Sequence, residues 1–109
     1  MKYGNKKVKV DNIIFDSKKE ARRYAELKML IRCGEIDNLI LQPQFELIPS
    51  FRKNGKTYRK TVYKADFSYY DRQKQKTIIE DTKGYRTELY RLKKKLFEYK
   101  YPDKEIIET

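Results

Sequence analysis

The sequence predicts one α/β domain over residues 1–109, and three observations lead to that prediction. Two segments have the apolar spacing of amphipathic helices, and several apolar runs show the alternation of strands. The chain is long enough for one modest hydrophobic core and too short for two. We therefore predict the order helix, three strands, helix, strand on one mixed sheet, after a short strand around residues 8–15.

The first helix is predicted in DSKKEARRYAELKMLIRCG, residues 16–34. Ser17 is a favourable N-cap residue, and Glu20 stands three positions later, as in a capping box. Gly34 is a typical residue just beyond a helix C-terminus. These signals predict a helix that begins after Ser17 and ends before Gly34.

The remaining elements are predicted from turn and cap residues. Two strand-like runs, NLILQPQFELIPSF at 38–51 and KTYRKTVYKADFSYY at 56–70, flank Asn54-Gly55, a dipeptide typical of hairpin turns. The polar segment DRQKQK then leads into a third run, TIIEDTKG at 77–84. Thr87 is predicted to open the second helix and Pro102 to end it, before a last strand in KEIIET.

The charge of the chain points to a polyanionic partner. Lys and Arg number 27 against 16 Asp and Glu, which gives a formal net charge of +11. That excess is larger than solubility alone requires of a small domain. No long apolar run indicates a signal peptide or a membrane span, so we expect a cytoplasmic protein.

The composition also excludes several kinds of chemistry. The chain has no His, which removes His-based acid–base catalysis and His-ligated metal sites. Cys33 is the only Cys, so it cannot form an internal disulfide, and we expect it to be buried at a helix end. Catalysis would have to use carboxylates, Lys, Tyr and a metal held through oxygen.

Two carboxylates stand in the predicted strands. By alternation, Tyr63, Ala65, Phe67 and Tyr69 are expected to form an apolar strand face. Asp66 is expected on the opposite, polar face, and antiparallel pairing would bring it beside Asp81. Two adjacent carboxylates repel unless a cation lies between them. Oxygen ligands favour Mg²⁺ or Mn²⁺ as that cation, which would activate a bound water and stabilise charge on a phosphodiester.

Lys83 lies on the same strand face as Asp81 by alternation and would orient that water or neutralise developing charge. The alternative is that Asp81 and Lys83 are an ordinary pair on a solvated strand face. A single Asp-x-Lys triplet does not decide between these interpretations.

The wider pattern resembles the PD-(D/E)XK nuclease superfamily, from about Ser17 to the end of the chain. The resemblance implies a restriction-endonuclease-like core, a mixed central sheet flanked by helices. It identifies Asp66 and Asp81 as the two acidic motif residues and Lys83 as the motif lysine. It also implies that the Thr82 carbonyl contributes to the metal site and that Glu20 is the acidic residue of the first helix. Ala65 precedes Asp66 where the motif name has Pro. The segments FDSKKEARRYAEL and EDTKGYRTELYRLKKKLFEYKYP are also similar to small phage-encoded proteins that resemble Holliday-junction resolvases.

Glu20 has two possible roles. As the last residue of a capping box it would only reach back to the start of the helix. However, it also begins the core-facing stripe of that helix, which is Glu20, Tyr24, Leu27 and Ile31. A buried carboxylate needs a charged partner, so the stripe favours a role in the metal site.

The basic side of the second helix is either a solvated face or a nucleic-acid contact, and its place directly after KGYR favours the contact. Its expected core stripe is Leu89, Leu92 and Leu96, and its N-terminus and basic side would meet phosphates beside the metal. The residues assigned to this contact are Arg86, Thr87, Tyr90, Arg91, Lys93, Lys94 and Lys95. The hairpin FRKNGKTYRK at 51–60 is either a backbone-gripping arm or a solvated tip.

Together these features predict a Mg²⁺-dependent endodeoxyribonuclease, with Mn²⁺ as the alternative ion. The resemblance favours branched DNA as substrate, a homodimer with two active sites, and the cytoplasm of a bacterial host if the protein is phage-encoded. The alternative is a catalytically silent, basic nucleic-acid-binding protein whose acidic pair is structural.

Overall fold

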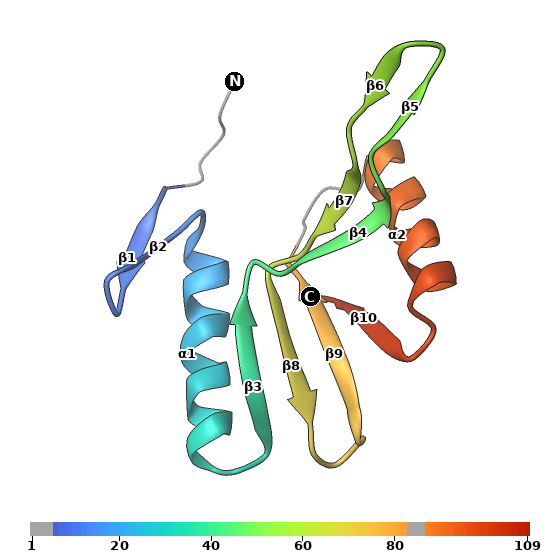
Figure 1. Cartoon of the computed structure of the whole chain (residues 1–109). Coiled ribbons are helices and arrows are strands. Elements are labelled where there is room, and N and C mark those ends of the chain that lie inside the picture. Colours follow the sequence, from blue (N-terminus) through green and yellow to red (C-terminus); the bar gives the residue numbers. More distant parts are fainter. Residues whose placement is uncertain (1–5, 83–86) are drawn as a thin grey trace.

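The structure, a computed structural model, describes residues 6–82 and 87–109. Figure 1 shows a mixed α/β arrangement with one helix at each side of a small sheet. The helices of the described residues are α1 (Lys18–Arg32) and α2 (Glu88–Lys100). Their strands are β1 (Val8–Val10), β2 (Ile13–Phe15), β3 (Ile36–Leu41), β4 (Gln44–Ile48), β5 (Phe51–Lys53), β6 (Lys56–Tyr58), β7 (Thr61–Lys64), β8 (Phe67–Asp71), β9 (Lys76–Asp81) and β10 (Lys104–Glu108).

The central sheet has the strand order β10-β9-β8-β3. β3, β8 and β9 pair antiparallel, whereas β10 pairs parallel to β9 after the chain has passed through α2. The sheet is therefore mixed, and along the chain its strands and the helices follow the order α1, β3, β8, β9, α2, β10. This is the predicted order of elements.

Two of the predicted long strands are broken, and in this respect the sequence prediction is wrong. The run 38–51 is divided into β3, β4 and β5, and the run 56–70 into β6, β7 and β8. Gln42 has a positive φ of 50° and precedes Pro43, so the chain leaves the sheet there. Pro49 interrupts the next pairing, because proline has no N–H to donate.

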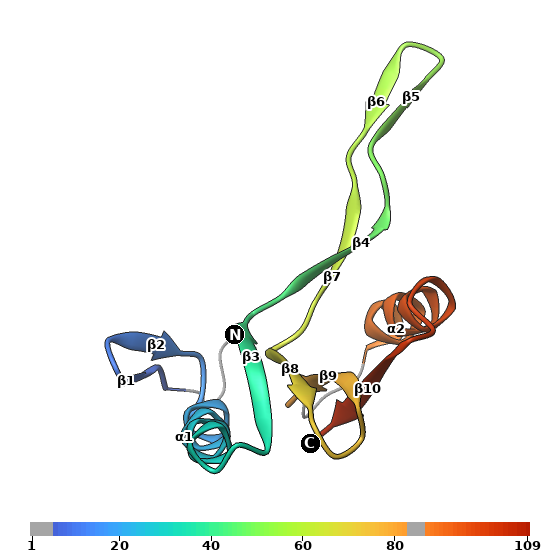
Figure 2. The same ribbon diagram turned by 60° about the horizontal axis from the view of Figure 1, so that its bottom comes forward.

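The middle segments form an arm that leaves the sheet. β4 pairs with β7, and β5 pairs with β6, both antiparallel. In Figure 2 this two-stranded arm extends well beyond the sheet and the helices. The turn between β5 and β6 is Asn54-Gly55, with φ values of 54° and 74°, as a tight hairpin turn requires.

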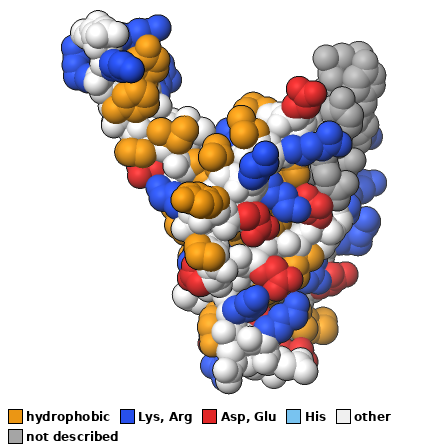
Figure 3. Space-filling view, turned by 90° about the vertical axis from the view of Figure 1, so that its right-hand side faces the viewer, with side chains coloured by type: hydrophobic (Ala, Val, Ile, Leu, Met, Phe, Trp, Pro, Cys, Tyr) orange, Lys and Arg blue, Asp and Glu red, His pale blue; other side chains and the backbone are white. Residues whose placement is uncertain are grey.

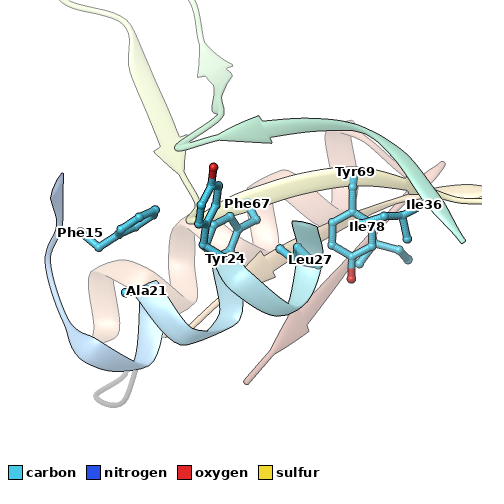
Figure 4. Close-up of a cluster of buried hydrophobic side chains, with 8 residues drawn as sticks. All are labelled: Phe15, Ala21, Tyr24, Leu27, Ile36, Phe67, Tyr69 and Ile78. Atoms are coloured by element: carbon cyan, nitrogen blue, oxygen red, sulfur yellow. The ribbon is translucent and has the colours of Figure 1, made fainter. Parts of the chain in front are cut away.

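α1 covers one face of the sheet, where the first apolar cluster lies (Figure 4). Its buried members are Phe15, Ala21, Tyr24, Leu27, Ile36, Phe67, Tyr69 and Ile78. The predicted stripe of α1 is confirmed: Glu20, Tyr24 and Leu27 are buried and Ile31 packs beside them. A large apolar side chain buried in this way contributes roughly 1.5–3 kcal/mol to folding.

α2 covers the other side through a second cluster, made of Leu47, Tyr63, Ala65, Ile79, Tyr90 and Phe97. The predicted core stripe of α2 is wrong, because Leu89 and Leu92 are 60% and 51% exposed and only Leu96 packs partly against the cluster. Tyr90 and Phe97, seven positions apart, form the buried side instead.

The single apolar face predicted for residues 63–69 is also wrong. Tyr63 and Ala65 belong to the cluster under α2, whereas Phe67 and Tyr69 belong to the cluster under α1. The chain changes sides at the break between β7 and β8, where residues 65 and 66 lie outside both strands.

Both helices begin at the predicted caps. The Ser17 hydroxyl accepts a hydrogen bond from the Glu20 N–H, and the Thr87 hydroxyl accepts one from the Tyr90 N–H. Gly34 follows α1 with a φ of 76°, as expected beyond a helix end. Cys33 is exposed, so the expectation that it is buried is wrong. Neither α1 nor α2, the helices of the described residues, is long and apolar enough to cross a membrane.

Candidate active site

The β8–β9 pairing ends just before the two predicted aspartates. Phe67 and Glu80 are its last register pair, and Asp66 and Asp81 are the next residues along the two segments. The backbone N–H of Asp66 donates to the carbonyl oxygen of Glu80 at 3.0 Å, one residue out of that register. The side-by-side placement of Asp66 and Asp81 that the sequence predicts therefore stays a prediction.

The side chain of Asp66 holds Thr82. One carboxylate oxygen, Oδ2, accepts hydrogen bonds from the N–H and the hydroxyl of Thr82, both at 2.6 Å. These two hydrogen bonds hold Thr82, the residue that directly follows β9. Asp66 is itself partly exposed.

Glu20 reaches the same place from the first turn of α1. Its side chain is buried, with 4% of the residue exposed, and Oε1 accepts a long hydrogen bond of 3.4 Å from the Asp16 N–H. Burial, and then the neighbouring Asp66 carboxylate, raise the pKa of Glu20 from 4.5 to about 7. Glu20 is thus both a residue at the helix cap and a carboxyl group facing Asp66.

Asp81 is almost fully buried, with 1% of the residue exposed. Its Oδ2 accepts a hydrogen bond from the Tyr63 hydroxyl at 2.8 Å. Burial, together with this bond and the charge of Asp81, raises the pKa of Tyr63 above its ordinary value, so Tyr63 remains a proton donor. β7 therefore supplies the group that orients the Asp81 carboxylate.

The next residue, Glu80, is a buried carboxylate that the sequence analysis did not identify. Arg23 donates to it twice, from Nε at 2.8 Å and from Nη2 at 2.5 Å, and the Tyr69 hydroxyl also donates to it. This fork-like pairing raises the pKa of Arg23 and compensates a charge that is 1% exposed. The signal for burial was available, because Glu80 shares its strand face with Ile78.

A basic pocket of about 360 Å³ opens beside Thr82, and the sequence analysis did not predict it. It is lined by Lys19, Arg22, Arg23, Glu26, Thr82 and Thr109. Arg23 is committed to Glu80, and Lys19 donates to the backbone oxygen of Thr109 at 2.7 Å. Arg22 is exposed. The pocket offers cationic groups to an anion next to the Asp66–Thr82 contact.

A second pocket of about 490 Å³ lies at the N-terminal end of α2. It is lined by Val62, Tyr63, Lys64, Thr87, Leu89, Tyr90 and Lys93. Three of the residues assigned to nucleic-acid contact, Thr87, Tyr90 and Lys93, meet there beside Tyr63, the partner of Asp81. The helix N-terminus and two lysines make this pocket favourable for a phosphate.

The other α2 residues assigned to nucleic-acid contact, Arg91, Lys94 and Lys95, do not line this pocket. Lys94 lies 3.3 Å from Glu108, and the Tyr90 hydroxyl donates to the same carboxylate at 2.6 Å. Lys94 therefore has an internal anion, whereas Arg91 and Lys95 are exposed. Lys83 and Arg86, the predicted motif lysine and one predicted phosphate contact, lie outside the described residues.

The oxygen donors suit a hard divalent cation in chemical type. In the described ranges, 6–82 and 87–109, no three His, Cys, Asp or Glu side chains form a group that could hold a metal ion. Mg²⁺, however, is commonly held by one or two carboxylates and otherwise by water and substrate phosphate. The assignment of such an ion to Asp66, Asp81, the Thr82 carbonyl and Glu20 stays a prediction.

The fold and these side chains define a basic, mixed α/β protein with a cluster of acidic residues at one end of its sheet. A model of the family described as "Protein of unknown function (DUF1064)" matches residues 1–108, so the chain belongs to that family. No curated protein and no solved structure matches the chain significantly.

Proposed function

We propose that this protein is a metal-dependent endodeoxyribonuclease with a restriction-endonuclease-like core of the PD-(D/E)XK type. One observation carries the proposal: Asp66 and Asp81 directly follow the last β8–β9 register pair, Phe67 and Glu80, and buried Glu20 faces Asp66 from α1. The order α1, β3, β8, β9, α2, β10 supports the same assignment, with the arm inserted between β3 and β8.

Each residue of the proposed site has a distinct role. A Mg²⁺ ion, when bound, supplies Lewis acidity toward a phosphodiester and lowers the pKa of a water. Asp66 and Asp81 hold negative charge where the ion is expected, and Tyr63 and Thr82 orient the two carboxylates through hydrogen bonds. The resemblance assigns the charge beside the attacking water to Lys83, which makes it the residue whose loss should affect turnover and spare binding.

The substrate is proposed to be branched DNA. The two pockets that flank the acidic residues carry Lys19 and Arg22 on one side and Lys64 and Lys93 on the other. Such a distribution supports duplex backbones on both sides of the site. Two strands of a branch need two active sites, so the proposal includes a homodimer, which sedimentation analysis would test.

The direct test is incubation with labelled duplex, single-stranded, flap and four-way-junction DNA, with Mg²⁺ and with EDTA. We expect Mg²⁺-dependent cleavage with the highest rate on a branched substrate. A second measurement does not depend on turnover: Mg²⁺ should raise the urea midpoint of the wild type and not that of Asp66→Asn, because an ion that binds only the folded state stabilises it. Absence of both effects would contradict the proposal.

A catalytically silent nucleic-acid-binding protein is the second candidate function. It is favoured by the hydrogen bonds that Asp66 and Asp81 already accept from Thr82 and Tyr63, since these give both carboxylates a structural role. Lys83→Met distinguishes the two functions in single-turnover cleavage of a four-way junction, beside a gel shift in Ca²⁺. A nuclease should lose about a hundredfold in rate and keep its binding. Rates within about threefold would favour the silent protein.

A further inference from the structure

The tip of the arm, residues 51–60, is exposed along its whole length. It comprises β5, the Asn54-Gly55 turn, β6 and the two residues that follow. Its basic residues are Arg52, Lys53, Lys56, Arg59 and Lys60. No Asp or Glu occurs between residues 47 and 65, so the whole region is cationic. Figure 3 shows the tip with blue basic and orange apolar side chains, whereas blue and red alternate over the body.

Two lysines of the tip are placed directly against each other. Lys53 pairs with Lys56 across the hairpin, in the last register position before the turn. Like charges directly opposite each other destabilise a two-stranded pair. A hairpin that served only as a structural extension would gain from a Glu or Thr at either position, so the pair indicates an anion outside the chain.

The tip is also held in one shape before any ligand arrives. Phe51 and Tyr58, opposite each other in the register, stack with ring centroids 4.8 Å apart and an angle of 12°. Lys56 Nζ lies 5.2 Å from the centre of the Tyr58 ring. Arg52 donates to the Thr57 hydroxyl and to the Gly55 carbonyl oxygen. The charged groups are therefore presented from a fixed platform, which lowers the entropic cost of binding.

We propose that residues 51–60 form a second nucleic-acid-binding site, which takes the sugar–phosphate backbone of a duplex segment away from the acidic residues. The inference deepens the proposed function and rests on its DNA substrate. A second copy of this chain is a poorer occupant, because its net charge of +11 would repel the tip. The binding is electrostatic and needs neither a metal nor cleavage.

The test compares Lys53→Gln/Lys56→Gln with Arg32→Gln/Lys74→Gln. The control pair loses the same charge from exposed positions at the C-terminal end of α1 and in the β8–β9 turn, which Figure 1 places at the end of the sheet remote from the arm. Affinity for a fluorescein-labelled four-way junction and a plain duplex is measured by anisotropy in EDTA, from 50 to 300 mM NaCl. We expect the tip variant to lose roughly tenfold in affinity at low salt and one to two units of salt slope, with at most half of either effect in the control.

A fluorescence measurement reports on the tip itself. The chain has no Trp, so Tyr58→Trp introduces a single Trp there, whose emission is excited selectively above the Tyr absorption band, and Tyr70→Trp on β8 is its control. We expect DNA to change the emission of the tip variant and not that of the control.

The outcomes separate this inference from the proposed function. Equal affinity losses in the two double variants, with no change in emission of Tyr58→Trp, would overturn the tip site whether or not the protein cleaves DNA. A specific loss at the tip, without Mg²⁺-dependent cleavage, would support the site and contradict the nuclease. If the wild type binds neither probe in EDTA at 50 mM NaCl, the tip site is overturned as well.

Discussion

Glu20 on α1 and Glu80 on β9 are both buried, but their charged neighbours differ: Glu80 is paired with a cation, and Glu20 lies against another carboxyl group. Glu80 is 1% exposed and receives two donors from Arg23 and one from Tyr69. Glu20 is 4% exposed and faces the carboxylate of Asp66. α1 supplies both the cation for the first and the carboxyl group of the second, about one helical turn apart.

The comparison shows that burial of a carboxylate does not by itself mark a functional site. Glu80 is explained by the fold, because its charge is compensated within the chain. The Glu20–Asp66 pair is not explained in this way, since two adjacent carboxyl groups destabilise each other unless a proton or an external cation joins them. A carboxyl pair that no cation of the described residues joins is the more informative signal for function.

The largest effect should come from changing the two aspartates proposed to hold the ion. Asp66→Asn and Asp81→Asn should each lower DNA cleavage by about a hundredfold or more, because each removes a charge proposed to hold the ion. Binding to a junction in Ca²⁺ should stay equal or become tighter. The measurement is single-turnover cleavage at saturating enzyme, with Asp103→Asn, an exposed carboxylate, as control. Full activity of either folded site variant would remove that residue from the active site.

Removing the cation that is paired with Glu80 should lower the stability of the fold. Arg23→Met leaves the Glu80 charge buried without its cation and should cost about 3 kcal/mol of unfolding free energy. Urea unfolding followed by far-UV circular dichroism measures this loss. Arg22→Met is the matched control, because Arg22 is exposed and should change stability by less than about 0.5 kcal/mol. Equal stability of the two variants would mean that the Glu80 pair contributes nothing.

The pH dependence of stability sharpens the comparison further. The pKa of Glu20 is raised from 4.5 to about 7, so the folded state holds its proton more tightly than the unfolded state. The contribution of protonated Glu20 to the free energy of unfolding is therefore fully present below pH 4.5 and is lost as the pH rises through 7. It should amount to about 3 kcal/mol at most.

Glu20→Gln, which cannot ionise, should reduce this loss of stability between pH 5 and 8. The measurement is urea unfolding of both proteins across that range. At pH 8 added Mg²⁺ should restore stability to the wild type more than to Glu20→Gln, because a cation then replaces the proton. Parallel pH profiles of the two proteins would show that Glu20 ionises normally and serves only the helix cap.

The smallest expected effect is on DNA affinity, and it compares two lysines of α2. Lys94 lies beside Glu108, whereas Lys93 lines the pocket at the helix N-terminus. Lys93→Ala should therefore reduce the slope of log affinity against log salt by about one unit, and Lys94→Ala by clearly less. Anisotropy titrations of a labelled junction over a salt series provide the slopes. Equal reductions would mean that Glu108 does not restrain Lys94.

Local signals predicted much of the fold. Ser17, Thr87 and Asn54-Gly55 act through their own backbone neighbours, so the helix starts and the hairpin turn could be predicted from short segments. The antiparallel pairing of β8 with β9 was predicted from the short polar turn between them. This part of the fold needs no long-range information.

The features that the sequence analysis missed depend on contacts between distant segments. The sequence analysis assumed one continuous strand over residues 63–69. The chain in fact changes sides of the sheet at Ala65 and Asp66, so Tyr63 was assigned to the wrong face. Tyr90 replaces Leu89 in the core because its hydroxyl finds Glu108, a partner on another strand. The partner of Glu80 lies 57 positions away on α1, where no local pattern indicates it.

The arm also bears on how copies of this protein coexist. A two-stranded ribbon has two edges with unpaired backbone groups, which can recruit a strand from another molecule and start aggregation. Lysines and arginines along residues 51–60 oppose such recruitment, because each arm repels the next. We therefore expect a variant with a neutral tip to aggregate at a lower protein concentration than the wild type.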